Sequence, residues 1–196
     1  MKKLLINIAF FTFVLNLIVS SNAYALSSLA NDLIRECNKC DEEFPPANWN
    51  MEQLRSAGLE ILNAIESGSV ERSNLYCCLY ALGYVKNPND IDRILKYEKD
   101  MPTTVLHTLD GFPHEKAIKC MLRFTISKDE ILRELAYIGL GNVDYTKLEK
   151  DSKKWREKAK NMLIEKRRIE KKDWILESLD KALKKIDSNA TGTSTK

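Results

Sequence analysis

Apolar residues recur along most of this chain at the spacing of one helix face. Near the N-terminus they follow an i, i+3, i+7, i+8, i+11 series formed by Leu26, Leu29, Leu33, Ile34 and Cys37. Residues 51–67 repeat such a pattern, and a pair of prolines separates the two stretches. These spacings indicate amphipathic helices, because a helix returns to the same face about every 3.6 residues. No segment alternates apolar and polar residues as a strand does, so the sequence predicts an all-α fold.

Three glycines stand at a constant spacing in the middle of the chain. Gly83, Gly111 and Gly139 are 28 residues apart, and each closes an apolar segment: LYCCLYALG, TTVLHTLDG and ILRELAYIG. A further helical segment follows each of the first two glycines, NDIDRILKYEKD and HEKAIKCMLRFT. We interpret each unit as a helix that ends at its glycine, a short turn and a returning helix. Such pairs cannot bury their apolar faces alone, so successive pairs must stack.

The segment ALGYVKNPNDIDRIL, residues 81–95, resembles the repeat of HEAT-like proteins in their short bacterial form. Two later segments match the repeat less well, LHTLDGFPHEKAIKCML and LAYIGLGNVDYTKL. The resemblance covers about residues 70–150. It implies a short α-solenoid of stacked antiparallel helix pairs. It also implies a binding scaffold for another protein, without catalysis of its own.

The C-terminal part differs from the repeats in its spacing and charge. Apolar residues recur there every seven positions, at Leu148, Trp155, Met162, Ile169, Leu176 and Leu183. The series predicts one long helix, or two helices broken near Lys172-Asp173, that either caps the solenoid or projects as a partner-binding arm. We therefore expect a single domain over residues 26–187, divided into N-terminal helices (26–69), HEAT-like repeats (70–145) and this C-terminal part (146–187). The polar tail, 188–196, is expected to be disordered.

The first 25 residues have the composition of a cleaved signal peptide. A basic start at Lys2 and Lys3 precedes an apolar run over residues 4–20, and Ala23-Tyr24-Ala25 offers a cleavage site after Ala25. We expect a periplasmic or secreted protein. Removing the two lysines reduces the formal charge from +3 to +1, which gives no reason to expect a nucleic-acid partner.

Five cysteines raise the question of thiol chemistry. Cys37 and Cys40 have the spacing of a redox dithiol, but they close a helix, where the helix dipole disfavours a thiolate. We interpret the pair as a structural disulfide or two partly buried thiols, and a thiol-redox protein as the alternative function. Cys78 and Cys120 are expected in the core. The spacing predicts no metal site and no cofactor.

The remaining polar residues favour structural roles. His107 aligns with apolar positions of the neighbouring units and is expected to pack in a helix, whereas His114 is expected to be exposed at a helix start. Asn89 or Asp90 is expected to cap the returning helix of the first unit. The basic cluster Lys166-Arg167-Arg168 with Lys171-Lys172 is read as a solvated face, with an acidic partner or membrane headgroups as the alternative.

The sequence therefore predicts an exported helical scaffold that is not an enzyme and that binds a partner protein of unknown identity. A periplasmic immunity or inhibitor protein is one concrete form of this function. Contact with a membrane surface through the basic C-terminal helix is the less favoured alternative.

Overall fold

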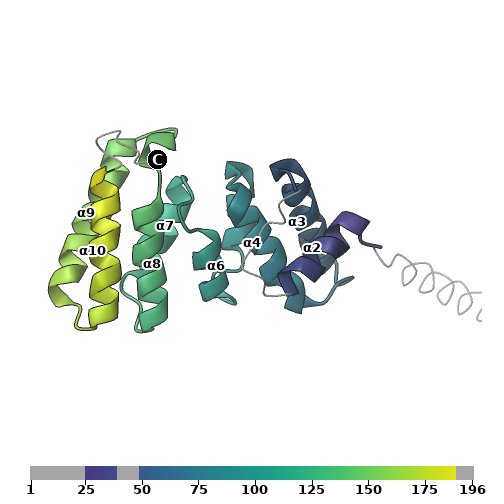
Figure 1. The fold of residues 1–196 in the computed structure, drawn as a ribbon, viewed down its shortest axis with the longest axis horizontal. Coiled ribbons are helices and arrows are strands. Elements are labelled where there is room, and N and C mark those ends of the chain that lie inside the picture. Colours follow the sequence, from purple (N-terminus) through teal and green to yellow (C-terminus); the bar gives the residue numbers. More distant parts are fainter. Residues whose placement is uncertain (1–24, 39–48, 189–196) are drawn as a thin grey trace, which may run out of the picture.

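The computed structural model describes residues 25–38 and 49–188, and every regular element in these ranges is helical (Figure 1). The α-helices are α2 (Ser28–Asn38), α3 (Met51–Glu66), α4 (Leu75–Val85), α5 (Ile91–Leu95), α6 (Pro102–Thr108), α7 (Glu115–Phe124), α8 (Glu130–Asn142), α9 (Ser152–Ile169) and α10 (Asp173–Ser188). Short 3₁₀ helices precede α4, α5 and α9, namely η1 (Arg72–Asn74), η2 (Pro88–Asp90) and η3 (Tyr145–Lys147). The all-α prediction is confirmed.

Two expected segments fall outside this description. The signal peptide predicted over residues 1–25 lies outside the described residues except for Ala25, and the tail predicted over 188–196 lies outside them except for Ser188. No helix among the described residues combines the length and apolar character needed to cross a bilayer.

The helices follow one another along the long axis of the molecule, from α2 and α3 at one end to α9 and α10 at the other (Figure 1). α4, α6, α8 and α10 pack in succession, with α3 against α4 and α7 against both α8 and α9. The main contacts therefore join helices that are neighbours or next neighbours in the chain. The solenoid of stacked antiparallel helix pairs and the HEAT-like resemblance both stay predictions.

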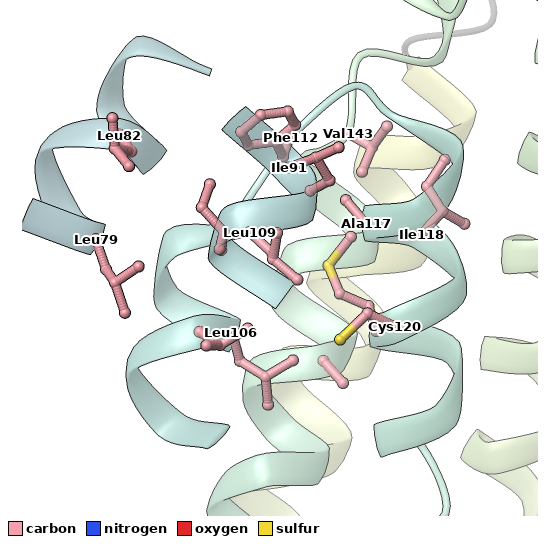
Figure 2. Close-up of a cluster of buried hydrophobic side chains, with 14 of the residues drawn as sticks. Leu79, Leu82, Ile91, Leu106, Leu109, Phe112, Ala117, Ile118, Cys120 and Val143 are labelled. Atoms are coloured by element: carbon pink, nitrogen blue, oxygen red, sulfur yellow. The ribbon is translucent and has the colours of Figure 1, made fainter. Parts of the chain in front are cut away.

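One hydrophobic core runs through the whole stack, from Ala30 on α2 to Ile186 on α10. Figure 2 shows its centre, where Leu106 and Leu109 of α6 lie between the leucines of α4 and the side chains of α7. Burying one such leucine stabilises the fold by about 1.5–3 kcal/mol relative to leaving it in water. Since α5 has 5 residues and α6 has 7, neither would persist alone in water, where helices shorter than about 12–15 residues are marginal. Burial against neighbours holds them in place.

The apolar stripes predicted for the first two units are buried, but the third is displaced. Leu75, Leu79, Leu82, Val105, Leu106 and Leu109 are all buried, as expected. On α8, however, Ile131 is 57% exposed, and Ala136, Tyr137 and Leu140 are the buried side chains. α8 is covered by α6 and α7 and also by α10, so the position of its buried face depends on a helix that lies far along the chain.

The three evenly spaced glycines do not share one role. Gly111 follows α6 with a φ of +62°, a left-handed conformation that suits glycine at a helix end. Gly83 and Gly139 instead lie inside α4 and α8. The expectation that each glycine ends its helix is therefore wrong for these two. α4 ends at Val85, and Lys86 takes the left-handed conformation there, with a φ of 54°.

Gly83 lets two helices approach closely. A Cβ at this position would lie 2.5 Å from the backbone oxygen of Thr108 and 2.7 Å from its Cα, both on α6. At Gly139 a Cβ would instead meet Sδ of Met121 at 2.5 Å. The backbone of α6 cannot move without disturbing the core, whereas a methionine side chain can turn away.

The C-terminal part forms two helices, α9 and α10, separated at residues 170–172. This agrees with the predicted break near Lys172-Asp173, and both helices pack onto the end of the core. The seven-residue series does not define their buried face, because Ile169 is 62% exposed. The buried positions are Trp155, Ala159 and Leu163 on α9, and Ile175, Leu179, Ala182 and Ile186 on α10. Each helix buries its own stripe against the preceding ones, as a cap does.

Asp90 does not cap α5 in the expected way. It occupies the position before the helix but makes no side-chain cap bond, and Asn87 caps the preceding η2 by accepting from the backbone of Asn89. The Asp90 carboxylate instead accepts two hydrogen bonds from Arg55 on α3, at 2.7 and 2.8 Å. Its side chain is only 3% exposed, so this ion pair fixes the start of α5 against α3.

Replacing Gly83 by alanine tests the close approach of α4 and α6. We expect Gly83→Ala to lower the free energy of unfolding by about 1–3 kcal/mol, because overpacking against a backbone outweighs the better helix propensity of alanine. Gly139→Ala is the matched control inside another helix, and its cost should be smaller because Met121 can shift. Chemical denaturation measures both. A Gly83→Ala protein as stable as Gly139→Ala would contradict this account.

Candidate functional site

The first candidate site predicted from the sequence is the thiol pair Cys37 and Cys40. Cys40 lies outside the described residues, so the structure does not test this pair. Cys37, in the last turn of α2, is half-buried and contacts a different cysteine, Cys77 of α4. The interaction with Cys77, followed by burial, raises the pKa of Cys37, whereas the interaction with Cys37 lowers the pKa of Cys77 although burial opposes this.

The other two described cysteines are core residues, as expected. Cys78 is fully buried and its Sγ donates to the carbonyl oxygen of Leu75 at 3.0 Å. Cys120 is also fully buried among the side chains shown in Figure 2. Burial raises the pKa of each thiol to about 12. Both therefore act as small apolar residues that stay protonated.

The burial of the two histidines differs from what the sequence predicted. His107 is exposed on α6, with its ring 6.4 Å from that of Tyr80, so the expectation of a packed residue is wrong. His114 is half-buried as the N-cap of α7, where its Nδ1 accepts from the backbone of Lys116 at 3.1 Å. Within residues 25–38 and 49–188, no group of three or more His, Cys, Asp or Glu side chains is placed to hold a metal ion.

A second candidate site lies where two turns meet at the α9–α10 end of the molecule. Residues of the turn between α7 and α8 and of the turn between α9 and α10 line an open pocket of about 380 Å³. It is lined by Thr125, Ile126, Ser127, Glu130, Arg133, Tyr137, Lys166, Ile169, Glu170, Lys171 and Lys172. We call this the turn pocket.

An ion pair between Arg133 and Glu170 joins the two turns. The guanidinium donates to the Glu170 carboxylate at 3.1 and 3.4 Å and to the carbonyl oxygens of Ser127 and Lys128 at 3.0 and 3.1 Å. The same carboxylate accepts from the backbone of Lys171 at 3.0 Å, just before α10 begins. One arginine thus holds the α7–α8 turn, while its partner organises the start of α10.

The ion pair is largely shielded from water. The Arg133 side chain is 17% exposed and that of Glu170 is 8% exposed. Burial alone would raise the pKa of Glu170, but the hydrogen bonds from Arg133 and from the backbone after Glu170 outweigh it and lower the pKa below the ordinary value. The carboxylate therefore stays ionised in the fold.

The rim of the turn pocket is apolar and exposed. Ile126 is 71% exposed and Ile169 is 62% exposed, the highest values among the large hydrophobic side chains described. Ile131 and Trp174, in the first turns of α8 and α10, are 57% and 42% exposed. Ile126 and Ile169 line the pocket itself, while Ile131 and Trp174 are exposed in the helices that begin next to its two turns. Exposed large apolar side chains of this kind are typical of contact surfaces.

The turn pocket carries an excess of positive charge. Its lining holds four basic side chains and two carboxylates. Lys172 pairs with Glu130 at 3.3 Å and Arg133 with Glu170. Lys171 is exposed and has no ion-pair partner within 4.0 Å among the described residues. The basic cluster noted in the sequence is therefore divided, because Arg167 pairs with Asp180 on α10 while three of its lysines line this pocket.

Sequence reasoning found half of this site. The lysines after residue 165 were noted as a cluster, but Ile126 and Arg133 were not connected with them. The sequence signal for this part of the site was Ile126, an apolar residue in a turn that is normally exposed to water. Its pairing with a turn 43 residues later follows only from the packing of α7, α8 and α9.

Comparisons with known proteins add no assignment. No family model, curated protein or solved structure significantly matches this chain.

Removing the Glu170 charge tests the ion pair between the turns. We expect Glu170→Gln to lower the free energy of unfolding by about 1–3 kcal/mol at pH 7, because it leaves the Arg133 guanidinium without its carboxylate. The lowered pKa of Glu170 gives stability that is complete above the ordinary glutamate pKa, about 4.3, and is lost as pH falls through the folded-state value.

The difference between the wild type and Glu170→Gln should therefore shrink below about pH 4. Denaturation curves between pH 2 and pH 7 measure it. Glu177→Gln is the control, because Glu177 pairs with Lys181 on the exposed face of α10, and it should change stability little at any pH. A gap for Glu170→Gln that does not vary with pH would contradict the assignment.

Proposed function

We propose that this protein is an exported helical scaffold that binds a partner protein through the turn pocket. The partner segment carries carboxylates together with at least one apolar side chain. The observation that carries this proposal is that the highly exposed Ile126 and Ile169 line one pocket together with a net positive set of side chains. Export is supported by the basic start and apolar run of residues 1–25.

The chemistry of the turn pocket supports an acidic and apolar ligand. In the part of the chain that the structure describes, Lys171 has no ion-pair partner and Lys172 pairs with the carboxylate of Glu130 at 3.3 Å, so both ammonium groups can interact with a partner's carboxylate. Ile126 and Ile169 would lose contact with water when an apolar side chain covers them, and this burial favours binding. A segment with only one of these properties would leave half of the surface unused.

The surface favours a protein partner over a membrane. Membrane binding by basic residues relies on several uncompensated cations on one broad face. Here Arg167 is paired with Asp180, and Glu165 and Glu170 lie within the same run. The remaining cations border a shallow, open pocket that also holds Ile126 and Ile169, which suits a protein segment with both charged and apolar side chains.

The Arg133–Glu170 pair supports the proposal in a second way. It fixes both turns before a partner arrives, so little conformational entropy is lost when the surface is covered. The scaffold therefore presents a pre-formed site, as stacked helix pairs do in general.

Affinity capture with matched variants tests this function. The wild type, immobilised, is used as bait for proteins of the producing cell's envelope, beside a double variant with Ile126→Ser and Lys171→Glu. The expected result is that a partner held by the wild type is lost with the double variant, by at least about tenfold. Both substitutions are at exposed positions and should leave the fold intact.

Lys153→Glu is the control bait, because Lys153 is exposed on α9 and lies outside the turn pocket. It carries the same charge change as Lys171→Glu. Equal capture by all three baits would refute the turn pocket as the binding site. Binding of the wild type to vesicles of anionic lipid, in place of any captured protein, would favour the membrane alternative.

A further inference from the structure

Lys166 differs from the other lysines of the turn pocket in its surroundings. Its side chain is only 12% exposed, and its Nζ lies 3.8 Å from the carboxylate of Glu165, which is too long for a hydrogen bond. In the part of the chain that the structure describes, this Nζ has no closer carboxylate and makes no hydrogen bond. Withdrawing an ammonium group from water without a close partner is costly, so this position favours an anion supplied by a ligand.

The Lys166 ammonium group can be reached from the turn pocket. Within residues 25–38 and 49–188, the one buried side-chain nitrogen or oxygen atom without a hydrogen-bond partner is Nε1 of Trp155. Since Lys166 Nζ also lacks such a partner, it is not fully buried, and the residue lines the turn pocket. The protein therefore covers most of the lysine side chain while its charged end stays open to a ligand.

The other cations of the turn pocket are less suited to hold a single carboxylate. Arg133 donates to Glu170 and to carbonyl oxygens of the α7–α8 turn, and Lys172 has a carboxylate partner of its own. Lys171 is exposed, and an ion pair made by an exposed lysine contributes little. Lys166 is therefore the position where a carboxylate gains most.

Apolar surface and a hydrogen-bond donor lie next to this ammonium group. Ile169 follows Lys166 by three residues on α9, a spacing that places two Cβ atoms about 5–6 Å apart on one helix face. Ile169 and Ile126 are highly exposed and line the same pocket. The Ser127 hydroxyl, also in the lining, accepts from the backbone of Asp129 at 3.1 Å. Its own proton remains available to a ligand oxygen.

We propose that the turn pocket binds the free C-terminus of the partner protein. The α-carboxylate of the partner lies at Lys166, and the apolar side chain of its last residue lies against Ile126 and Ile169. Only at a chain end does one residue carry both a backbone carboxylate and an apolar side chain, so one residue can satisfy both parts of the site. This inference rests on the proposed function, because it specifies the segment that the same site takes.

The size and openness of the turn pocket favour a chain end over other carboxylates. Its volume of about 380 Å³ is near the lower limit of ligand pockets, which span about 300–1,000 Å³. A fatty acid offers the same two chemical groups, but an open pocket of this size would leave much of a long acyl chain in water.

A titration of the ¹⁵N-labelled protein with three acetylated peptides tests the proposal. The first is a short peptide of serine and glycine that ends in leucine with a free carboxylate, and the second is its C-terminal amide. The third holds one leucine between two aspartates and is also amidated. We expect the free acid to bind at least about tenfold more tightly than its amide, with chemical shift changes at residues 125–133 and 166–172.

Variants of Lys166 identify the group that holds the carboxylate. Lys166→Gln should abolish the preference for the free acid, whereas Lys166→Arg should retain most of it because the charge remains. Lys153→Gln is the control, since Lys153 is an exposed residue of α9 outside the turn pocket, and it should leave the preference unchanged. Circular dichroism confirms that each variant folds.

Four results would overturn the proposal. They are equal affinity for the free acid and its amide, no binding of the free acid, a preference that survives in Lys166→Gln, and tighter binding of octanoate than of the free acid. The third peptide separates this failure from failure of the proposed function. If it alone binds, only the chain-end assignment falls, and if no peptide binds, both proposals fall.

Discussion

The short helices of this protein cannot bury their apolar faces alone, and its architecture depends on that constraint. α5 and α6, with 5 and 7 residues, are far below the length at which a helix persists in water, about 12–15 residues. Each is stable only between its neighbours, which is why one core continues from α2 to α10. The close approach of α4 to α6 at Gly83 follows from the same constraint. Short helices bury enough apolar surface only when their backbones lie close together.

Two partly buried ion pairs lie where the chain turns from one helix to the next. Arg55 and Asp90 join α3 to the start of α5, and Arg133 and Glu170 join the turn before α8 to the turn before α10. In both cases an arginine of one helix holds a carboxylate at the end of another segment, Asp90 just before α5 and Glu170 just after α9, so a turn is fixed by a side chain from a distant segment. The second pair lies at the surface that we propose to bind a partner, and it holds the two turns of that surface together.

The fold class could be predicted from the sequence because helical periodicity is a local property. The buried leucines of α4 and α6, the buried Cys78 and Cys120, and the break between α9 and α10 follow from spacing and charge alone. The exposure of Ile131 and His107 could not, since it depends on which helices cover α8 and α6. The seven-residue series that includes Ile169 was misleading for a related reason. Its first member, Leu148, precedes α9, and the others fall on two separate helices, α9 and α10, each with its own buried stripe. The turn pocket and the Cys37–Cys77 contact are products of packing between distant segments, and no local pattern encodes them.

The central claim is that the turn pocket takes a segment that is both acidic and apolar. The most direct measurement is a nuclear magnetic resonance titration of the ¹⁵N-labelled protein with a synthetic peptide that carries aspartates on both sides of one leucine. The control is the same peptide with asparagine in place of aspartate. We expect saturable shifts confined to the amides of residues 125–133 and 166–174 with the acidic peptide, and much weaker shifts with the control. Equal shifts with both peptides, or shifts centred on α2 to α4, would contradict the account.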